Sequence, residues 1–302
     1  MTTSYSNLLK PIVHALFNEE VVGIQEITDA GEVNQVYVVT TDSHKVIARI
    51  NAVGELSRFQ KEQWCIEQAA QAGVKGAEVL AVGSGDDHAY MLTWYIEGKR
   101  ADQSGVDTEV VWRAVGEYAK KIHSIPIKGF GEDLNDITSG DMQKWRNYLN
   151  YNSSSLGEHD VLIEKGIITA EQSELLSKSF SDLAQLDVQL GLSHGDLSLD
   201  NIIVGLDDAV NLIDWGSAEG HIVPHYDLGV ILDDSLSDDS DEFAEVLDGY
   251  GLSVDEYSAI KDQINSLMAL IATDKVRWAI DRSPESLDST IARLKKALGR
   301  LQ

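Results

Sequence analysis

The sequence predicts an α+β protein in two parts, a strand-rich front and a helix-rich back. Short β-branched runs such as VVGIQEI, NQVYVVT and KVIARI dominate the first part, and such runs are typical of strands. Apolar residues spaced three or four apart dominate the second part, as in amphipathic helices. The pattern changes near 94–99, which predicts an N-terminal lobe over 1–96 and a helical C-terminal lobe over 97–302.

The front part is expected to contain two helices and an antiparallel sheet. Residues 5–18 carry apolar side chains at helical spacing. Three strand runs follow, separated by DAGEV and TDSH, which predicts a meander of neighbouring strands. A helix is expected over about 55–72, ending near Gly73. AEVLAVG and AYMLTWYI then predict two further strands around the turn SGDDH.

The back part is mostly helical, with one strand–loop–strand insert. Helical patterns occupy about 107–124, 141–150, 169–189, 239–249, 254–281 and 285–301. The insert, residues 194–215, reads HGDLSLDNIIVGLDDAVNLIDW. Its apolar runs NIIV and VNLID, on either side of GLDDA, predict a hairpin with Asp207 and Asp208 in the turn.

Charge and composition limit the classes of partner that the protein is expected to bind. The 302 residues include 24 basic and 50 acidic side chains, a net charge of −26, which repels nucleic acid and favours cationic ligands. The single cysteine, Cys65, excludes an intramolecular disulfide. The N-terminus lacks a signal-peptide pattern, and no apolar run is long enough to span a membrane. We therefore expect a cytoplasmic protein without nucleic acid or membrane partners.

Three polar side chains flank the predicted hairpin. Asn201 at its entry and Asp214 at its exit are expected side by side, because an antiparallel pair brings its outer ends together. Amide and carboxylate oxygens are ligands that suit Mg²⁺. Asp196, five residues before Asn201, could face the same point and take a proton from a hydroxyl. Each residue alone is typical of ordinary turns, whereas the combined H-x-D-x₄-N and I-D-W pattern is far more specific.

This combined pattern resembles the catalytic loop and metal motif of the aminoglycoside phosphotransferase family, which is related to choline kinases. VGEYAKKIHSIPIKGFG resembles the family's helix ending in leucine- or isoleucine-histidine, and HYDLGVIL resembles its aspartate at a helix start. GFG followed by KWRNYL is most similar to hygromycin B phosphotransferases. The resemblance covers most of the chain and implies a bilobal protein-kinase-like fold, with a small antiparallel-sheet N-lobe and a larger helical C-lobe.

The resemblance implies roles for five residues around the hairpin. Asp196 would be the catalytic base or the carboxylate that orients the acceptor hydroxyl. Asn201 and Asp214 would hold Mg²⁺ between the phosphates of ATP or GTP. His194 would brace the catalytic loop, and Asp227 would tie that loop down by hydrogen bonds.

The resemblance also implies a nucleotide site in the front part. Arg49 in KVIARI takes the place of the usual phosphate-contacting lysine, and an arginine can bind two phosphate oxygens at once. Glu62 is its expected ion-pair partner, with Glu67 as the alternative. DAGEVNQVYVV would be the nucleotide loop; its single Gly31 departs from the protein-kinase pattern, and Asn34 or backbone N–H groups are expected to compensate.

The connector between the lobes would be MLTWYIEG, where adenine would bond to backbone groups of Trp94 and Ile96. The acceptor would bind in the helical part. Glu219 is the candidate for gripping an ammonium group, whereas the acidic stretch 233–243 is equally well explained as a solvated loop. For a choline-like acceptor an aromatic cage would serve, and its candidates are Trp145, Tyr148 and Tyr151, although helix packing explains them equally well.

Three functions remain open from the sequence. The preferred one is a Mg²⁺-dependent O-phosphotransferase acting on a small cationic hydroxyl compound, an aminoglycoside antibiotic, which would confer resistance. The second is a metabolic kinase of the same fold for choline, ethanolamine, homoserine or a sugar. The third is an inactive nucleotide-binding module, suggested by Arg49 and the glycine-poor loop. The motifs do not separate the first two, because a fold does not fix a substrate.

Overall fold

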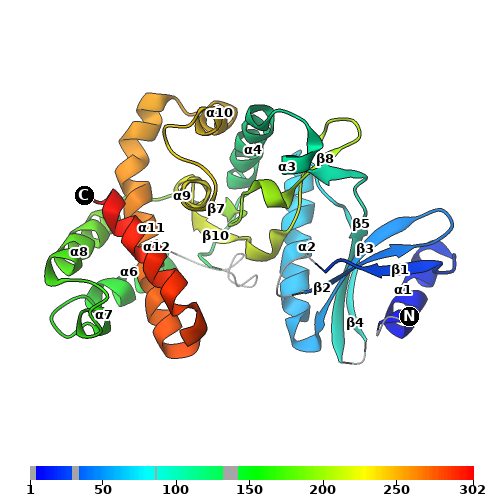
Figure 1. Cartoon of the computed structure of the whole chain (residues 1–302), viewed down its shortest axis with the longest axis horizontal. Coiled ribbons are helices and arrows are strands. Elements are labelled where there is room, and N and C mark those ends of the chain that lie inside the picture. Colours follow the sequence, from blue (N-terminus) through cyan, green and yellow to red (C-terminus); the bar gives the residue numbers. More distant parts are fainter. Residues whose placement is uncertain (1–4, 29–33, 86, 132–141) are drawn as a thin grey trace. The chain divides into compact units, whose positions relative to one another are not determined.

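The computed structural model describes residues 5–28, 34–85, 87–131 and 142–302, and they form an α+β fold (Figure 1). Two compact units emerge from the contacts. The N-terminal unit comprises 1–108 and 199–218, and the C-terminal unit comprises 109–198 and 219–302. The N-terminal unit thus takes in a segment, 199–218, that lies within the helical lobe expected from the sequence.

The N-terminal unit contains a five-stranded antiparallel sheet with strand order β1-β2-β3-β5-β4. The five predicted strands are all present, because alternating apolar residues and short turns encode them locally. Their bounds are β1 Gly23–Glu26, β2 Gln35–Thr40, β3 Lys45–Ala52, β4 Val79–Gly85 and β5 His88–Trp94.

Two helices cover opposite faces of this sheet. Helix α1 (Ser6–Phe17) packs Leu9 and Val13 against the face that carries alternate residues of β3. Helix α2 (Leu56–Gln71), which follows a 3₁₀ turn, packs Phe59 against the other face. Because side chains alternate along a strand, Arg49 of β3 lies on the α2 face.

The second sheet of the N-terminal unit contains the predicted hairpin. Strands β8 (Ile202–Gly205) and β9 (Val210–Leu212) pair antiparallel, and β6 (Gly98–Arg100), followed by the short helix α3 (Ala101–Ser104), pairs with β8. Asp208, in the turn between β8 and β9, has a φ of 59°, a left-handed conformation that Asp tolerates better than most residues. The hairpin prediction is confirmed.

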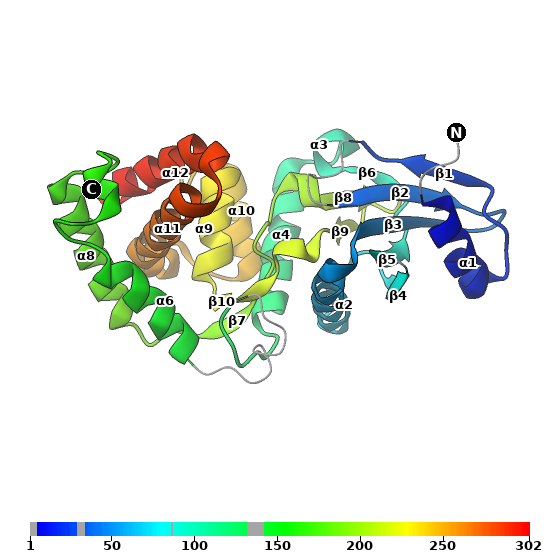
Figure 2. The same cartoon turned by 90° about the horizontal axis from the view of Figure 1, so that it is seen from below.

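The C-terminal unit is built around one long helix, α11 (Val254–Arg282). Its middle is buried on nearly all sides, since α6, α8, α9 and α12 pack around it (Figure 2). The other helices are α4 Thr108–His123, α6 Gln143–Ser154, α7 Val161–Glu164, α8 Ala170–Ala184, α9 His225–Asp234, α10 Asp241–Tyr250 and α12 Leu287–Arg300. Among the described residues, no helix is both long and apolar enough to cross a membrane.

A two-stranded ribbon that the sequence patterns did not predict lies in the C-terminal unit. Strand β7 (Leu190–Ser193) pairs antiparallel with β10 (Glu219–Ile222). Each strand is only four residues long, too short for a periodic signal. The register sets Glu219 opposite Ser193, so the ribbon places Glu219 beside the residue that precedes the HGD motif.

A buried arginine ties three helices of the C-terminal unit together. Arg277 of α11 is 6 % exposed; its guanidinium lies 2.7 Å from Asp160 and 3.0 Å from two oxygens of Asn152 at the end of α6. The Asp160 carboxylate also accepts from the Leu162 N–H at 2.9 Å and so caps α7. One cation thus satisfies both a buried carboxylate and a helix end.

We expect Arg277→Met to lower the free energy of unfolding by about 3–5 kcal/mol, because it leaves the Asp160 carboxylate buried without its cation. The matched control is Arg282→Met, an exposed position at the end of the same helix, which should change it by less than about 0.5 kcal/mol. Urea unfolding followed by circular dichroism measures both. Equal effects of the two substitutions would contradict the role of Arg277.

Candidate functional site

Arg49 is the centre of a charge cluster in the N-terminal unit. Its guanidinium forms an ion pair with Glu62 of α2, a carboxylate that is 3 % exposed, and its second terminal nitrogen lies 3.4 Å from an oxygen of Asp214. Glu67 is exposed and accepts instead from Gln63 at 2.7 Å. The structure therefore decides between the two candidate partners, and the partner is Glu62.

Burial dominates the electrostatics of Glu62. Removal from water raises the pKa of this carboxyl above its usual value, and the nearby negative charge of Asp214 adds to the rise, while Arg49 and Lys61 oppose it. The carboxylate can remain charged here only because the guanidinium is held against it. Arg49 is thereby fixed in place while one side of its guanidinium faces Asp214.

The hairpin brings its two expected metal-ligand positions together. The Ile213 N–H, one residue before Asp214, donates to the Asn201 carbonyl at 2.9 Å. Asn201 is buried, whereas the Asp214 side chain is 49 % exposed. Asp214 has a φ of 58°, an uncommon conformation for a residue other than glycine, and begins the 3₁₀ turn Trp215–Ser217. The open end of the β8–β9 hairpin thus carries an exposed carboxylate, that of Asp214, on a constrained backbone.

The side-chain oxygens of Asn201 and Asp214 fit a cation that also binds phosphate and water oxygens. Among the described residues, no group of three or more His, Cys, Asp or Glu side chains gathers into a metal-binding cluster. An amide and one carboxylate are hard oxygen donors. Mg²⁺ is commonly held by one or two protein carboxylates together with phosphate and water oxygens. Asn201 and Asp214 fit such a partial site.

The remaining nucleotide-loop candidates have defined positions. The Asn34 side chain accepts from Asn51 at 2.8 Å, just before β2. Trp94 ends β5, and its N–H donates to the Glu78 carbonyl at 3.0 Å. Ile96 lies in the segment between β5 and β6. Gly31 and the rest of DAGEV, residues 29–33, lie outside the described residues.

In the C-terminal unit, the buried Asp227 of α9 holds the loop that leads to Asp196. Its carboxylate accepts from the backbone N–H groups of His194 at 3.0 Å and Gly195 at 2.8 Å. Gly195 has a φ of 78°, a conformation that glycine adopts without strain. His194 itself is fully buried. Asp227 therefore fixes the backbone of the two residues that precede Asp196.

Two residues to which the sequence assigned no role complete the contacts around Asp227. His123, at the end of α4, contacts Asp227 through Nε2 at 2.9 Å and the Tyr250 hydroxyl through Nδ1 at 3.0 Å. Burial raises the pKa of Asp227, but the hydrogen bond and charge of His123 and the N–H of Gly195 outweigh it, so the pKa lies below its usual value. The sequence pattern marks the isoleucine-histidine end of this helix but assigns His123 no role; Tyr250 carries no signal.

Glu219 lies beside a cluster of aromatic rings. Its carboxylate accepts from the Tyr226 hydroxyl, and the Tyr148 hydroxyl bonds to Asp274. Phe130 lies between these groups, with ring centroids 5.5 Å from Tyr148 and 4.9 Å from His221, and His221 stacks on Tyr226 at 3.9 Å. Two carboxylates thus border a cluster of largely buried aromatic rings in the C-terminal unit.

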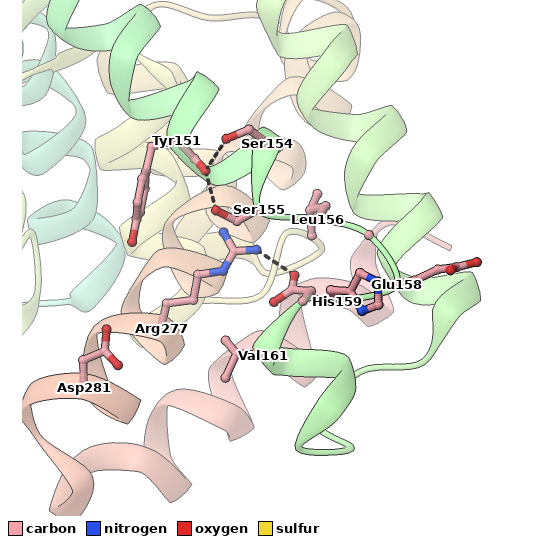
Figure 3. Close-up of a pocket in the computed structure, with 11 residues that line it drawn as sticks. Tyr151, Ser154, Ser155, Leu156, Glu158, His159, Val161, Arg277 and Asp281 are labelled. Carbon is pink, nitrogen blue, oxygen red and sulfur yellow. Dashed lines mark hydrogen bonds and ion pairs between the residues drawn. The ribbon is translucent and has the colours of Figure 1, made fainter.

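The third cage candidate, Tyr151, faces elsewhere. It is 58 % exposed and lines a cavity of about 500 Å³ between α6, α7 and α11 (Figure 3). Arg277 also lines this cavity, and the Ser154 and Ser155 hydroxyls donate to the Tyr151 carbonyl there. Trp145 and Tyr148 instead contact Phe130, so the three aromatic residues do not form one cage.

The acidic stretch 233–243 already has cationic partners. Asp233 pairs with Arg300, Asp234 with Arg293 at 2.8 Å, and Asp238 with Lys261. These pairs attach the end of α9 and the following loop to α12 and α11. These three acids thus have structural partners, which makes Glu219 the stronger ligand candidate.

The chain belongs to a family of phosphoryl-transferring enzymes: the model described as the phosphotransferase enzyme family matches residues 24–262. No curated protein matches the sequence. Among solved structures, a thermostable mutant of aminoglycoside phosphotransferase APH(4)-Ia, in ternary complex with ADP and hygromycin B, is similar with a TM-score of 0.66 and 15 % identity, over 97 % of this chain and 98 % of that chain.

Choline kinase LicA from Streptococcus pneumoniae is similar to the same degree, with a TM-score of 0.66 and 17 % identity over 98 % of both chains. LicA in complex with AMP gives a TM-score of 0.62 at 17 % identity, over 99 % of this chain and 98 % of that chain. At such identities the likeness shows the fold, which is the bilobal protein-kinase-like fold expected from the sequence.

The aromatic cluster predicts a pH dependence of stability. Burial lowers the pKa of His221 to about 3, well below its value of about 6.5 in an unfolded chain. The folded state therefore keeps His221 neutral, and its contribution is fully present above about pH 6.5 and is lost as the pH falls toward 3. At pH 4 the loss should be about 3 kcal/mol.

Urea unfolding between pH 7 and pH 4 checks this expectation. His221→Phe should flatten the decline, whereas His159→Phe, at an exposed position in the same unit, should leave it unchanged. An unaltered decline in the His221 variant would show that other groups cause it.

Proposed function

We propose that the protein is a Mg²⁺-dependent O-phosphotransferase that moves the γ-phosphate of ATP or GTP to a hydroxyl of a small cationic compound. The observation that carries this proposal is the Arg49 guanidinium, held by buried Glu62 and directed toward Asp214. A cation and an exposed carboxylate fixed beside each other are what a metal–triphosphate requires. Membership of the phosphotransferase family supports the same reaction class.

Each proposed residue has one task in the transfer. Arg49 neutralises charge on the nucleotide phosphates, and Asn201 and Asp214 hold Mg²⁺, which supplies further neutralisation when bound. Asp196 orients the acceptor hydroxyl and takes its proton as the oxygen attacks the γ-phosphorus, while the bond from the γ-phosphorus to the β-phosphate oxygen breaks and ADP or GDP leaves. Asp227 and His194 act through the loop, by keeping the backbone before Asp196 in place.

The nucleotide itself is proposed to bind along the sheet. The Trp94 carbonyl and backbone groups of Ile96 meet adenine or guanine, and Asn34 lies where the phosphate loop enters β2. Nucleotides occupy the similar structures, which were solved with ADP and with AMP. A cytoplasmic location, where ATP and GTP are abundant, fits this proposal.

A cationic acceptor is favoured by the C-terminal unit. Glu219 and Asp274 are carboxylates beside the cluster of aromatic rings, and carboxylates attract ammonium groups. An aminoglycoside antibiotic, with several ammonium groups, is our first candidate, and its phosphorylation would confer resistance. The rings of Phe130, Tyr148 and Tyr226 favour a second candidate, a choline-like amine, because cations bind over aromatic faces.

An inactive binding module is disfavoured by the same contacts. Arg49 stands where the resembled family usually has a lysine, and it forms an ion pair with Glu62. Arg is charged at every physiological pH. A chain that had lost catalysis would have no need to keep Asp196, Asn201 and Asp214 together with this pair.

The proposal predicts that Asp196→Ala lowers kcat by about 10²–10⁴-fold, because the acceptor hydroxyl loses its base. Nucleotide affinity should stay within about twofold, since Asp196 acts on the acceptor. The assay measures Mg²⁺-dependent ADP or GDP release with aminoglycosides, choline, ethanolamine, homoserine and sugars as acceptors.

Asp200→Asn is the matched control, because Asp200 lies in the same motif but pairs with Arg100. It should retain most activity. If the wild-type chain turned over no acceptor in the panel, or if the Asp196 variant kept full activity, the phosphotransferase proposal would fail. Turnover confined to choline or ethanolamine would replace the antibiotic with a metabolic amine.

A second prediction concerns the acceptor. Glu219→Gln keeps the oxygen that accepts from Tyr226 but removes the charge, so KM for a cationic acceptor should rise about tenfold with KM for ATP unchanged. Asp239→Asn, an exposed carboxylate in the acidic stretch, should change neither value. The reverse pattern would assign acceptor binding to 233–243 instead.

A further inference from the structure

A buried lysine that has no part in the mechanism above lies next to Glu62. Lys61 of α2 is 4 % exposed, although lysine is almost never buried unless it is paired. Burying an ammonium group is costly unless it is hydrogen-bonded and its charge is balanced. Its position therefore calls for a specific acceptor.

That acceptor belongs to the turn that carries Asp214. The Lys61 ammonium donates to the Gly216 carbonyl at 3.3 Å, and α2 packs against the 3₁₀ turn Trp215–Ser217. The negative charge of Glu62 lies next to it along the helix, and the positive charge of Lys61 favours the charged form of Glu62. Neighbouring residues of one helix thus serve two partners: Glu62 binds Arg49, and Lys61 binds the turn.

Gly216 lies against Asp214 and Arg49, the two charged groups of the proposed metal–phosphate site. A Cβ placed on Gly216 would be 3.4 Å from an Asp214 carboxylate oxygen and 4.0 Å from the Arg49 guanidinium. Asp214 itself has a left-handed backbone, which persists only where the surroundings enforce it. The Lys61 hydrogen bond is one such constraint, two residues away along the chain.

We propose that Lys61 is a positioning residue that fixes the direction of the Asp214 carboxylate toward the metal. This inference rests on the proposed function, in which Asp214 is a metal ligand. The contact between Arg49 and Asp214 is long, at 3.4 Å, and must loosen when a divalent cation and phosphates bind both groups. The bond from Lys61 goes to a backbone oxygen, so it persists in both states.

The test measures binding of the non-hydrolysable nucleotide AMP-PNP to the full chain by calorimetry, once with Mg²⁺ and once with EDTA. The wild-type chain should bind more tightly with Mg²⁺. Lys61→Met should retain metal-free affinity within about twofold but lose about tenfold of the metal-dependent gain, as expected when a partner of a metal ligand is removed. Asp214→Ala should abolish the gain.

Two further variants separate positioning from general stability. Lys61→Arg keeps a donor and the charge, and should recover part of the gain. Lys10→Met, at an exposed position on α1, should match the wild type. If Lys61→Met does not fold, Lys61→Leu, which also lacks a hydrogen-bond donor, gives the same readout. Amide exchange over 213–218 should be faster in the Lys61 variants, because the turn has lost its anchor.

The outcomes are distinct. An intact metal-dependent gain in a folded Lys61→Met or Lys61→Leu variant would overturn the positioning role and leave the proposed function standing. A wild-type chain whose nucleotide affinity is indifferent to Mg²⁺ would overturn the magnesium site itself, and the role of Lys61 with it.

Discussion

The burial of one carboxylate organises the N-terminal unit. Glu62 lies between the sheet and α2 at 3 % exposure, and an uncompensated charge there would cost several kcal/mol. Arg49 removes that cost, so β3 and α2 are held at the separation that one ion pair allows. Because the other side of the guanidinium faces Asp214, the same constraint sets where the end of the hairpin can lie.

The C-terminal unit also buries a carboxylate whose charge must be compensated, that of Asp227. This carboxylate is fully buried and is satisfied by His123 and by two backbone N–H groups of the loop before Asp196. In both units a buried acid is paired with a cation or hydrogen-bond donor, and a chemically important segment is positioned as a result. The proposed catalytic groups are therefore set by buried charges as well as by apolar packing.

Local patterns predicted most of the fold, and non-local packing accounts for the differences. The five strands and the hairpin follow from alternation and turn residues within each segment. The choice between Glu62 and Glu67 does not, because it depends on which side of α2 meets β3. The ribbon of β7 and β10 is equally non-local, since its two short strands are far apart in sequence.

In the candidate site, too, local sequence patterns predicted some features and contacts between distant segments decided others. The H-x-D-x₄-N and I-D-W pattern predicted the residues around the hairpin, and their assigned roles stay proposals. Tyr151 could not join Trp145, because six residues of helix turn the side chain by about 120° relative to the first. The ion pairs of 233–243 depend on α11 and α12, which no count of acidic residues could indicate.

Asp227 and Lys61 share a further property: both hold their loops by main-chain atoms, the N–H groups of His194 and Gly195 and the carbonyl of Gly216. A hydrogen bond to a main-chain atom does not depend on which side chain that residue carries. The side chains of such a loop can drift during evolution while its path is retained. This is consistent with a fold that is shared at only 15–17 % identity with an aminoglycoside phosphotransferase and a choline kinase, and it would let acceptor preference change while the backbone beneath it is retained.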